Sequence, residues 1–274
     1  MSAPASWGER AVRLALIGVA GLVLAFLLLP ILAIVPMSFN PTSFLVFPEG
    51  GLSLRWYRML AESPDWTRSF ANSLIIAGAT TAIATPLGTL AAIGLVNLKS
   101  RARPLVVALL GAPLVVPVIV VAIAFYFLFA PIGLTNSFVG LIIAHTVLAA
   151  PFVVIVVAAS LHGFDGSLLR AGASLGAPPA TVLFRVLLPL IAPGVVAGAV
   201  FAFMTSFDET VVTLFLAGPE QRTLPIQMFE GVREQISPAI TAAATLLVIA
   251  STLLLGSAEL LRRRAERLYG PPTH

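Results

Sequence analysis

Two adjacent carboxylates, Asp208 and Glu209, are the side chains in this sequence best placed to act on a solute. They follow the apolar run 187–207, which as a helix would be about 31 Å long at 1.5 Å per residue. A helix of this length could cross a lipid bilayer. Ionisable groups at the end of such a helix often line a path for ions or substrates, and paired negative charges attract cations. The pair is a candidate translocation site. The competing interpretation is that both acids only end one helix and cap the next.

Patterns for covalent, nucleotide or metal chemistry are weak. Residues 172–176 fit GxSxG, but that motif works only on a strand–turn–helix elbow of an α/β sheet. The only lysine, Lys99, follows Asn97-Leu98 rather than the glycines of a phosphate-binding loop. The three histidines have no ligand partners at helical spacing, and there is no cysteine. We therefore expect no catalytic residue and no metal site, and we expect His145 to form hydrogen bonds within a helix bundle.

The composition indicates that a lipid bilayer surrounds the elements carrying these groups. Of 274 residues, 58% are hydrophobic and only 10% are charged, whereas soluble domains carry about 25% charged residues. The mean hydropathy is +1.01. A membrane span needs about 20 apolar residues, and six runs are long enough. We therefore predict one all-α, polytopic membrane domain over 1–274, with spans at about 14–37, 73–98, 105–129, 138–161, 187–207 and 236–261.

The basic residues predict the orientation of these spans. With the N-terminus inside, the inner segments hold eleven of the 16 Lys and Arg residues and the outer segments hold five. Positive charge concentrates on the cytoplasmic side of membrane proteins, so both termini are expected in the cytoplasm. The pI of 10.3 then follows from topology and does not indicate nucleic-acid binding. The outer segment 208–239 is different, because it holds five acids against two arginines. Within it, 211–217 is apolar but too short to span, which leaves a re-entrant piece as one possibility.

The inner loop 161–186 is too polar to span and too long for a tight hairpin. Asp165 or Ser167 is predicted to cap a short helix there, and Gly176 with the two following prolines is predicted to end it. A short helix with an apolar face and little charge on the cytoplasmic side is suited to docking against another protein.

This loop, from Gly163 to Ala177, and the later Leu188-Pro189 and Pro193-Gly194 resemble the EAA loop of binding-protein-dependent ABC importer permeases. The resemblance implies a type I ABC importer permease fold with six transmembrane helices. It also implies that the loop is a coupling helix that fits a groove of a cytoplasmic ATPase. The coupling residues it implies are Asp165, Arg170, Ala171, Gly172, Leu175, Gly176 and Ala177. Arg170 stands where that family usually has Glu, and Gly172 where it has Ala, so we predict that a second, different permease carries the more typical loop.

A narrower resemblance, to the spermidine/putrescine permease branch, is carried by 53–57, 72–74, 163–165 and 206–209. In that branch, acids matching Asp208 and Glu209 are thought to line the translocation path, and the resemblance adds Ser206, from the same stretch, to the implied site. The implied partners are an ATP-binding cassette ATPase dimer, a second homologous permease and an extracytoplasmic substrate-binding protein. ATP and Mg²⁺ would bind the ATPase, with no cofactor on this chain.

The expected function is therefore import of a polyamine such as spermidine or putrescine across the cytoplasmic (inner) membrane. Alternatives within the same class are import of ferric ion, a phosphonate or another small organic cation. An ion-coupled secondary transporter would require charged residues buried in the middle of its helices, and the other apolar runs have none. An intramembrane enzyme would require converging nucleophile and base groups, which the sequence does not show.

Overall fold

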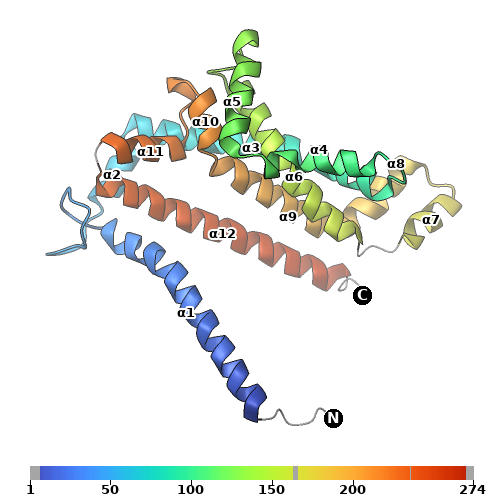
Figure 1. The fold of residues 1–274 in the computed structure, drawn as a ribbon, viewed down its shortest axis with the longest axis horizontal. Coiled ribbons are helices and arrows are strands. Elements are labelled where there is room, and N and C mark those ends of the chain that lie inside the picture. Colours follow the sequence, from blue (N-terminus) through green and yellow to red (C-terminus); the bar gives the residue numbers. More distant parts are fainter. Residues whose placement is uncertain (1–6, 163–165, 235, 270–274) are drawn as a thin grey trace. The chain divides into compact units, whose positions relative to one another are not determined.

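In a computed structural model, the chain is helical throughout the parts that the structure describes, residues 7–162, 166–234 and 236–269 (Figure 1). No strand occurs in these ranges. The α-helices are α1 (Trp7–Met37), α2 (Arg55–Glu62), α3 (Pro64–Asn97), α4 (Arg103–Val115), α5 (Val118–Phe129), α6 (Phe138–His162), α7 (Ser167–Ser174), α8 (Pro179–Val182), α9 (Leu188–Phe207), α10 (Val211–Leu216), α11 (Leu224–Glu234) and α12 (Pro238–Tyr269). Shorter turns are η1 (Ala130–Ile132), the π-helical η2 (Leu183–Leu187) and η3 (Pro219–Gln221).

The chain divides into two compact units, each described below by itself. The first combines the residues up to Ser63 with Gly231–Val248, and the second combines Pro64–Glu230 with the residues from Ile249 onward. The organisation as one domain over 1–274 stays a prediction.

Five helical segments in the described ranges are long and apolar enough to cross a membrane. They are Val12–Met37, Pro64–Asn97, Phe138–His162, Pro179–Phe207 and Pro238–Ser257. Each matches one of the predicted apolar runs, so the all-α, polytopic fold is confirmed. The segments at 64–97 and 179–207 begin about eight residues earlier than predicted. For the first of them, the added turns contain polar residues such as Asp65 and Arg68, which lie outside an apolar run.

The predicted span at about 105–129 contains a sharp break, so its crossing of the membrane as one span stays a prediction. The structure divides this run into α4 and α5, which meet at an angle of 102°. Val116 between them is extended, with φ −72° and ψ 133°, as favoured for a residue before proline. Pro117 also has no N–H to continue the helical hydrogen bonding of α4. The third run is therefore one broken span or a re-entrant piece.

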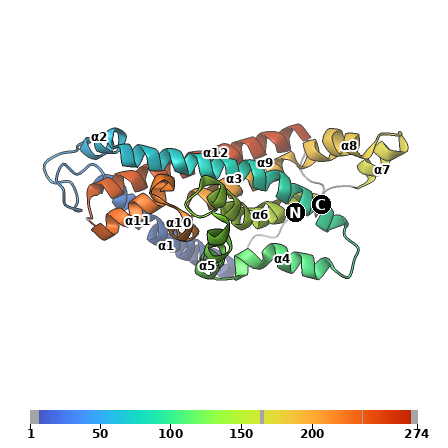
Figure 2. The same cartoon turned by 90° about the horizontal axis from the view of Figure 1, so that it is seen from above.

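The core of the second unit forms where α3, α6 and α9 pack together, and Figures 1 and 2 show the three helices side by side. Val153 of α6 is fully buried between two glycines. A Cβ on Gly88 of α3 would lie 2.6 Å from the Val153 Cβ, and one on Gly198 of α9 would lie 3.2 Å from its Cγ1. Small residues that let helix backbones approach closely are typical of packing within membranes.

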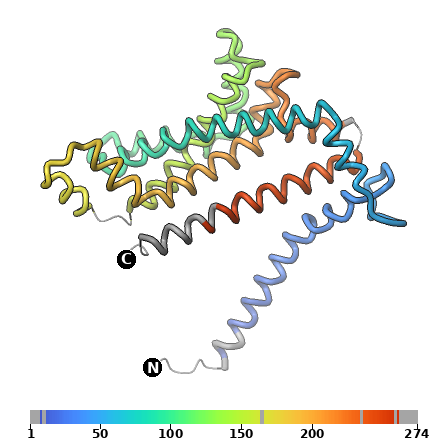
Figure 3. Tube along the Cα trace, turned by 180° about the vertical axis from the view of Figure 1, so that it is seen from behind, coloured from blue at the N-terminus to red at the C-terminus, as the bar shows by residue number. Residues whose placement is uncertain are grey.

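The chain before α9 turns sharply and then winds loosely. Gly176 is left-handed, with φ +79°, and ends α7 as predicted. The N–H of Ala177 then bonds Gly172 O at 3.2 Å, and that of Gly176 bonds Ala173 O at 3.0 Å, which is a Schellman ending. Figure 3 shows α7 and α8, in yellow, at one end of the unit, and the orange α10 at the other.

The π-helical turn η2 links α8 to α9. Pro189 has no N–H to donate to the carbonyl of Arg185, four residues earlier. Leu188 N–H bonds Leu183 O, five residues back, so the wider turn accommodates the proline while the helix continues. The whole stretch from Pro179 to Phe207 is thereby one apolar segment of 29 residues.

In the first unit, α2 anchors the loop that follows α1. Trp56 is buried, and its Nε1–H donates to Asn40 O at 2.9 Å. The Asn40 amide in turn donates to Phe44 O and Val46 O at 3.0 and 2.9 Å. The indole therefore packs against the protein's own loop.

Candidate translocation site

Glu209 is buried in the turn between α9 and α10 and caps the second helix. Its Oε1 accepts from the N–H of Val212 at 2.8 Å, and its Oε2 accepts from the N–H of Thr213 at 2.8 Å. Thr210, at the N-cap position, makes no capping bond with its side chain. Glu209 thus satisfies two of the four N–H groups that a helix start leaves unpaired, and its negative charge lies at the favourable end of the helix dipole. This arrangement fits the capping interpretation.

His145 of α6 lies beneath this turn and is fully buried. Its Nδ1 lies 2.8 Å from Ser206 Oγ on α9, and its Nε2 lies 3.1 Å from Thr213 Oγ1 on α10. The Nε2 atom is also 3.6 Å from Glu209 Oε2. The prediction that His145 forms hydrogen bonds between packed helices is confirmed. The predicted site residue Ser206 is buried in the same cluster and does not face solvent.

Asp208 is in a different environment from its neighbour. It is the C-cap residue of α9, just beyond the spanning segment, and its side chain is exposed. Partial loss of hydration raises the pKa of its carboxyl above the ordinary value of 3.8, and the nearby negative charge of Glu209 raises it further. Of the two adjacent acids, only Asp208 is exposed.

The start of α3 holds the loop that follows α10. Asn72 Nδ2 donates to Glu220 O at 2.8 Å and to Arg222 O at 2.9 Å. The next residue, Ser73, accepts from the N–H of Leu224 at 2.8 Å. These roles of Asn72 and Ser73 are not visible in the sequence, because their partners lie about 150 residues away.

Asn136 holds the other end of α10. Its N–H donates to Leu216 O at 2.8 Å, and its backbone is left-handed, with φ 55°. A Cβ on Gly218 would lie 3.1 Å from both Cβ and Oδ1 of Asn136. The short helix α10 is thus fixed at both ends, and it packs against α5 and α6.

The predicted coupling residues gather on α7 and its C-terminal turn. Arg170, Ala171 and Gly176 are exposed, and Leu175 is 88% exposed. Gly172 faces α8, because a Cβ there would lie 3.2 Å from Val182 Cγ2. Gly166 occupies the N-cap position of α7 and Ser167 is its first helical residue, so Ser167, one of the two predicted caps, is not at the N-cap. Asp165 lies outside the described residues.

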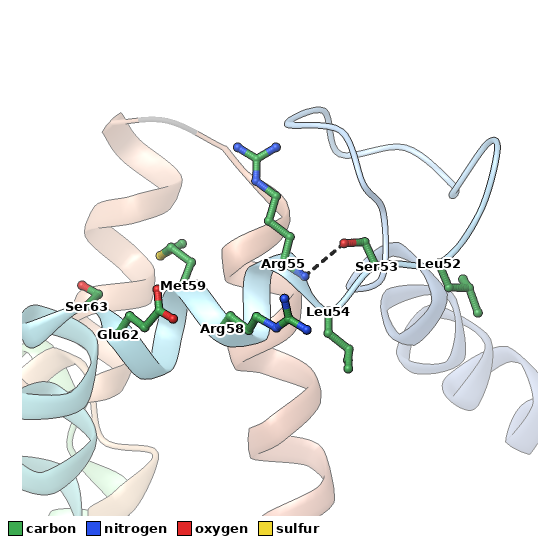
Figure 4. Close-up of a pocket in the computed structure, with 8 residues that line it drawn as sticks. All are labelled: Leu52, Ser53, Leu54, Arg55, Arg58, Met59, Glu62 and Ser63. Carbon is green, nitrogen blue, oxygen red and sulfur yellow. Dashed lines mark hydrogen bonds between the residues drawn. The ribbon is translucent and has the colours of Figure 1, made fainter.

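A separate cleft of about 890 Å³ lies in the first unit, along the start and exposed side of α2 (Figure 4). Its lining residues are Leu52, Ser53, Leu54, Arg55, Arg58, Met59, Glu62 and Ser63. Ser53 Oγ accepts from the Arg55 N–H at 3.1 Å, and the Arg55 guanidinium lies 4.9 Å from the centre of the Trp56 ring. None of the predicted site residues lines this cleft. In the described part of the chain, no group of three or more His, Asp or Glu side chains is arranged to hold a metal ion.

Comparison with known proteins gives consistent matches. Residues 84–267 match the family described as "Binding-protein-dependent transport system inner membrane component". The spermidine/putrescine transport system permease protein PotC of Escherichia coli (strain K12) is 34% identical over 239 residues, which cover 87% of this chain and 90% of PotC. The putrescine transport system permease protein PotI of the same strain is 33% identical over 249 residues, 88% of each chain.

A solved structure supports the fold. A chain of a bacterial ABC transporter involved in import of the acidic polysaccharide alginate superposes with a TM-score of 0.71 at 15% identity, over 96% of this chain and 99% of that chain. At this identity the likeness concerns architecture alone.

Proposed function

Because the chain belongs to the family of binding-protein-dependent transport system inner membrane components, we propose that it forms part of the membrane pore of a polyamine importer. The substrate class is a di- or triamine such as spermidine or putrescine. The observation that carries this choice is the exposed Asp208 carboxylate at the end of α9. The similarity to PotC and PotI supports the same choice.

The environment of Asp208 suits it to bind an ammonium group. A partly dehydrated carboxylate interacts with a cation more strongly than one in bulk water, because the local dielectric constant is lower. Charge-assisted hydrogen bonds from N⁺–H to a carboxylate are among the stronger polar contacts. The outer segment 208–239, with its excess of acids, would raise the local concentration of a polycation. Ser206 and Glu209 would then support the site from within.

ATP hydrolysis would take place on partner subunits that dock on the loop 161–186. The exposed Leu175 and Arg170 would contact the ATPase dimer. Because Arg170 replaces the usual Glu of this loop, a second homologous permease would supply the other half of the pore. An extracytoplasmic binding protein would deliver the amine on the side of Asp208, and both termini would lie in the cytoplasm. Purification of an active complex containing two copies of this chain would contradict the heteromeric arrangement.

The test is uptake of labelled spermidine and putrescine by cells that lack their own polyamine importers and express the complete operon. Asp208→Asn, which removes the charge and little volume, should reduce uptake by about tenfold or more, the effect of losing a charge-assisted contact. Glu220→Gln removes an exposed acid from the same outer segment and should retain near-parental uptake. Normal uptake by Asp208→Asn would remove support for the site. Absence of polyamine uptake by the parent would refute the substrate, and ferric ion and phosphonates would be tested next.

A further inference from the structure

A buried polar cluster joins three helices directly beneath Asp208. It consists of His145 from α6, Ser206 from α9, and Glu209 and Thr213 at the start of α10, and all four are less than a tenth exposed. These residues are separated by as many as 68 positions in the sequence. Around them, α10 packs against α5 and α6 mainly through the apolar side chains of Val212 and Leu216.

The imidazole ring of His145 is hydrogen-bonded on both sides. Its Nε2 bonds Thr213 Oγ1, which also lies 3.0 Å from Glu209 Oε2 and 3.2 Å from the Glu209 carbonyl oxygen. Its Nδ1 bonds Ser206 Oγ. Every polar side chain of the cluster has a partner.

The contacts on the two sides of the imidazole have different consequences. The Nδ1 bond to Ser206 connects α6 to α9, a pair of long helices that already pack extensively. The Nε2 bond to Thr213 connects α6 to α10, which has only six residues and would not be a stable helix by itself. Within this cluster, the contacts of Nε2 therefore tie the start of α10 and its turn to α6, and the Glu209 cap joins that turn to α10.

We propose that His145 is a positioning residue, which fixes α10 through Thr213 and thereby holds Asp208 in the orientation that receives a cation. Glu209 is the anchor of this arrangement and not a second ligand for the amine. The effect of His145 on transport rests on the proposed function, in which Asp208 binds the amine. The positioning of α10 by His145 does not depend on the substrate.

Two substitutions separate the two sides of the ring. In His145→Gln, the terminal amide lies near the position of Nε2 and can still form a hydrogen bond with Thr213. In His145→Asn, the shorter amide lies near the position of Nδ1, so it retains the Ser206 contact and loses Thr213. We expect His145→Asn to raise the KM for uptake about tenfold, as for the loss of one buried hydrogen bond, and His145→Gln to stay within about threefold. Membrane levels of both variants should match the parent. Equal KM values for the two variants would overturn the assignment.

A second measurement, thiol labelling, needs no substrate. The chain contains no cysteine, so an introduced cysteine is the single thiol on this chain. Val212→Cys places a thiol on the fully buried face of α10, and Ala84→Cys places one in the fully buried contact of α3 with α6 and α9. Each is combined with His145→Asn in the assembled transporter and treated with a membrane-impermeant maleimide. The proposal expects labelling of the Val212→Cys variant only when His145→Asn is also present, and no labelling of the Ala84→Cys variant.

The outcomes separate this inference from the proposed function. Labelling at both positions would mean general loosening of the helices, and labelling at neither would mean that α10 does not depend on His145. Either result overturns the positioning role. Selective labelling at Val212, together with absence of polyamine uptake by the parent, would leave the positioning role intact and refute only the substrate.

Discussion

Replacing Glu209 by Gln should destabilise the protein, whereas replacing Asp208 by Asn should not. The Glu209 carboxylate accepts one backbone N–H on each oxygen, both at 2.8 Å. An amide keeps one acceptor, and its NH₂ group must face the other N–H, which leaves a buried donor unpaired. Such a loss costs about 1–3 kcal/mol. Asp208 makes no comparable contribution. The raised pKa of Asp208 means that its carboxyl binds a proton more tightly in the folded protein than in the unfolded chain. Ionisation of Asp208 therefore lowers the free energy of unfolding as the pH rises above the ordinary pKa of aspartate.

The assay is thermal unfolding of the detergent-solubilised complex at neutral pH. At about 2–4 °C per kcal/mol for a chain of this size, Glu209→Gln should lower the Tm by several degrees, and Asp208→Asn should leave it unchanged or slightly higher. Glu209→Asp, which keeps the charge but shortens the reach, should lie between the parent and Glu209→Gln. A Tm for Glu209→Gln equal to that of the parent, or a larger loss for Asp208→Asn, would refute the division of roles between the two acids.

Three further predictions concern other parts of the chain. Gly88→Ala should destabilise the protein by about 1–3 kcal/mol, because its Cβ would meet Val153; Gly78→Ala in the same helix, with open space around it, is the matched control, and equal Tm values would contradict the close approach. Leu175→Ser should leave the Tm unchanged because the side chain is 88% exposed, yet reduce transport-coupled ATP hydrolysis severalfold; unaltered hydrolysis would argue against docking at that position. Lowering the external pH should reduce uptake, with the decline beginning above the ordinary aspartate range because the pKa of Asp208 is raised, and Asp208→Asn should abolish this component of the pH profile.

The sequence predicts the membrane spans well because burial in lipid imposes long apolar runs, and such runs are visible without any tertiary information. It does not predict the 102° bend between α4 and α5, because hydropathy is the same on both sides and contains no direction. A local signal was nevertheless present. Val116 precedes Pro117, and a proline both disfavours helical geometry in the residue before it and removes a hydrogen-bond donor.

The sequence locates the candidate site at Asp208 and Glu209, but it does not show which of the two acids caps a helix and which is exposed. Asp208 and Glu209 are adjacent acids of nearly equal chemistry, and both candidate roles fit the pair. What distinguishes them is the environment supplied by distant residues. His145 of α6 lies next to the buried Glu209 carboxylate, whereas Asp208 is exposed. Ser206 also belongs to the buried side of the turn.

The glycine contacts of Val153 have a consequence for how this chain can vary in evolution. One side chain sets two spacings at once, that of α3 from α6 through Gly88 and that of α6 from α9 through Gly198. A larger residue at 153 would force both neighbouring helices outward, and a smaller one would leave a gap on both sides. Three positions in different helices, at 88, 153 and 198, are therefore expected to change together across descendants of this sequence, although no two of them are close in the chain.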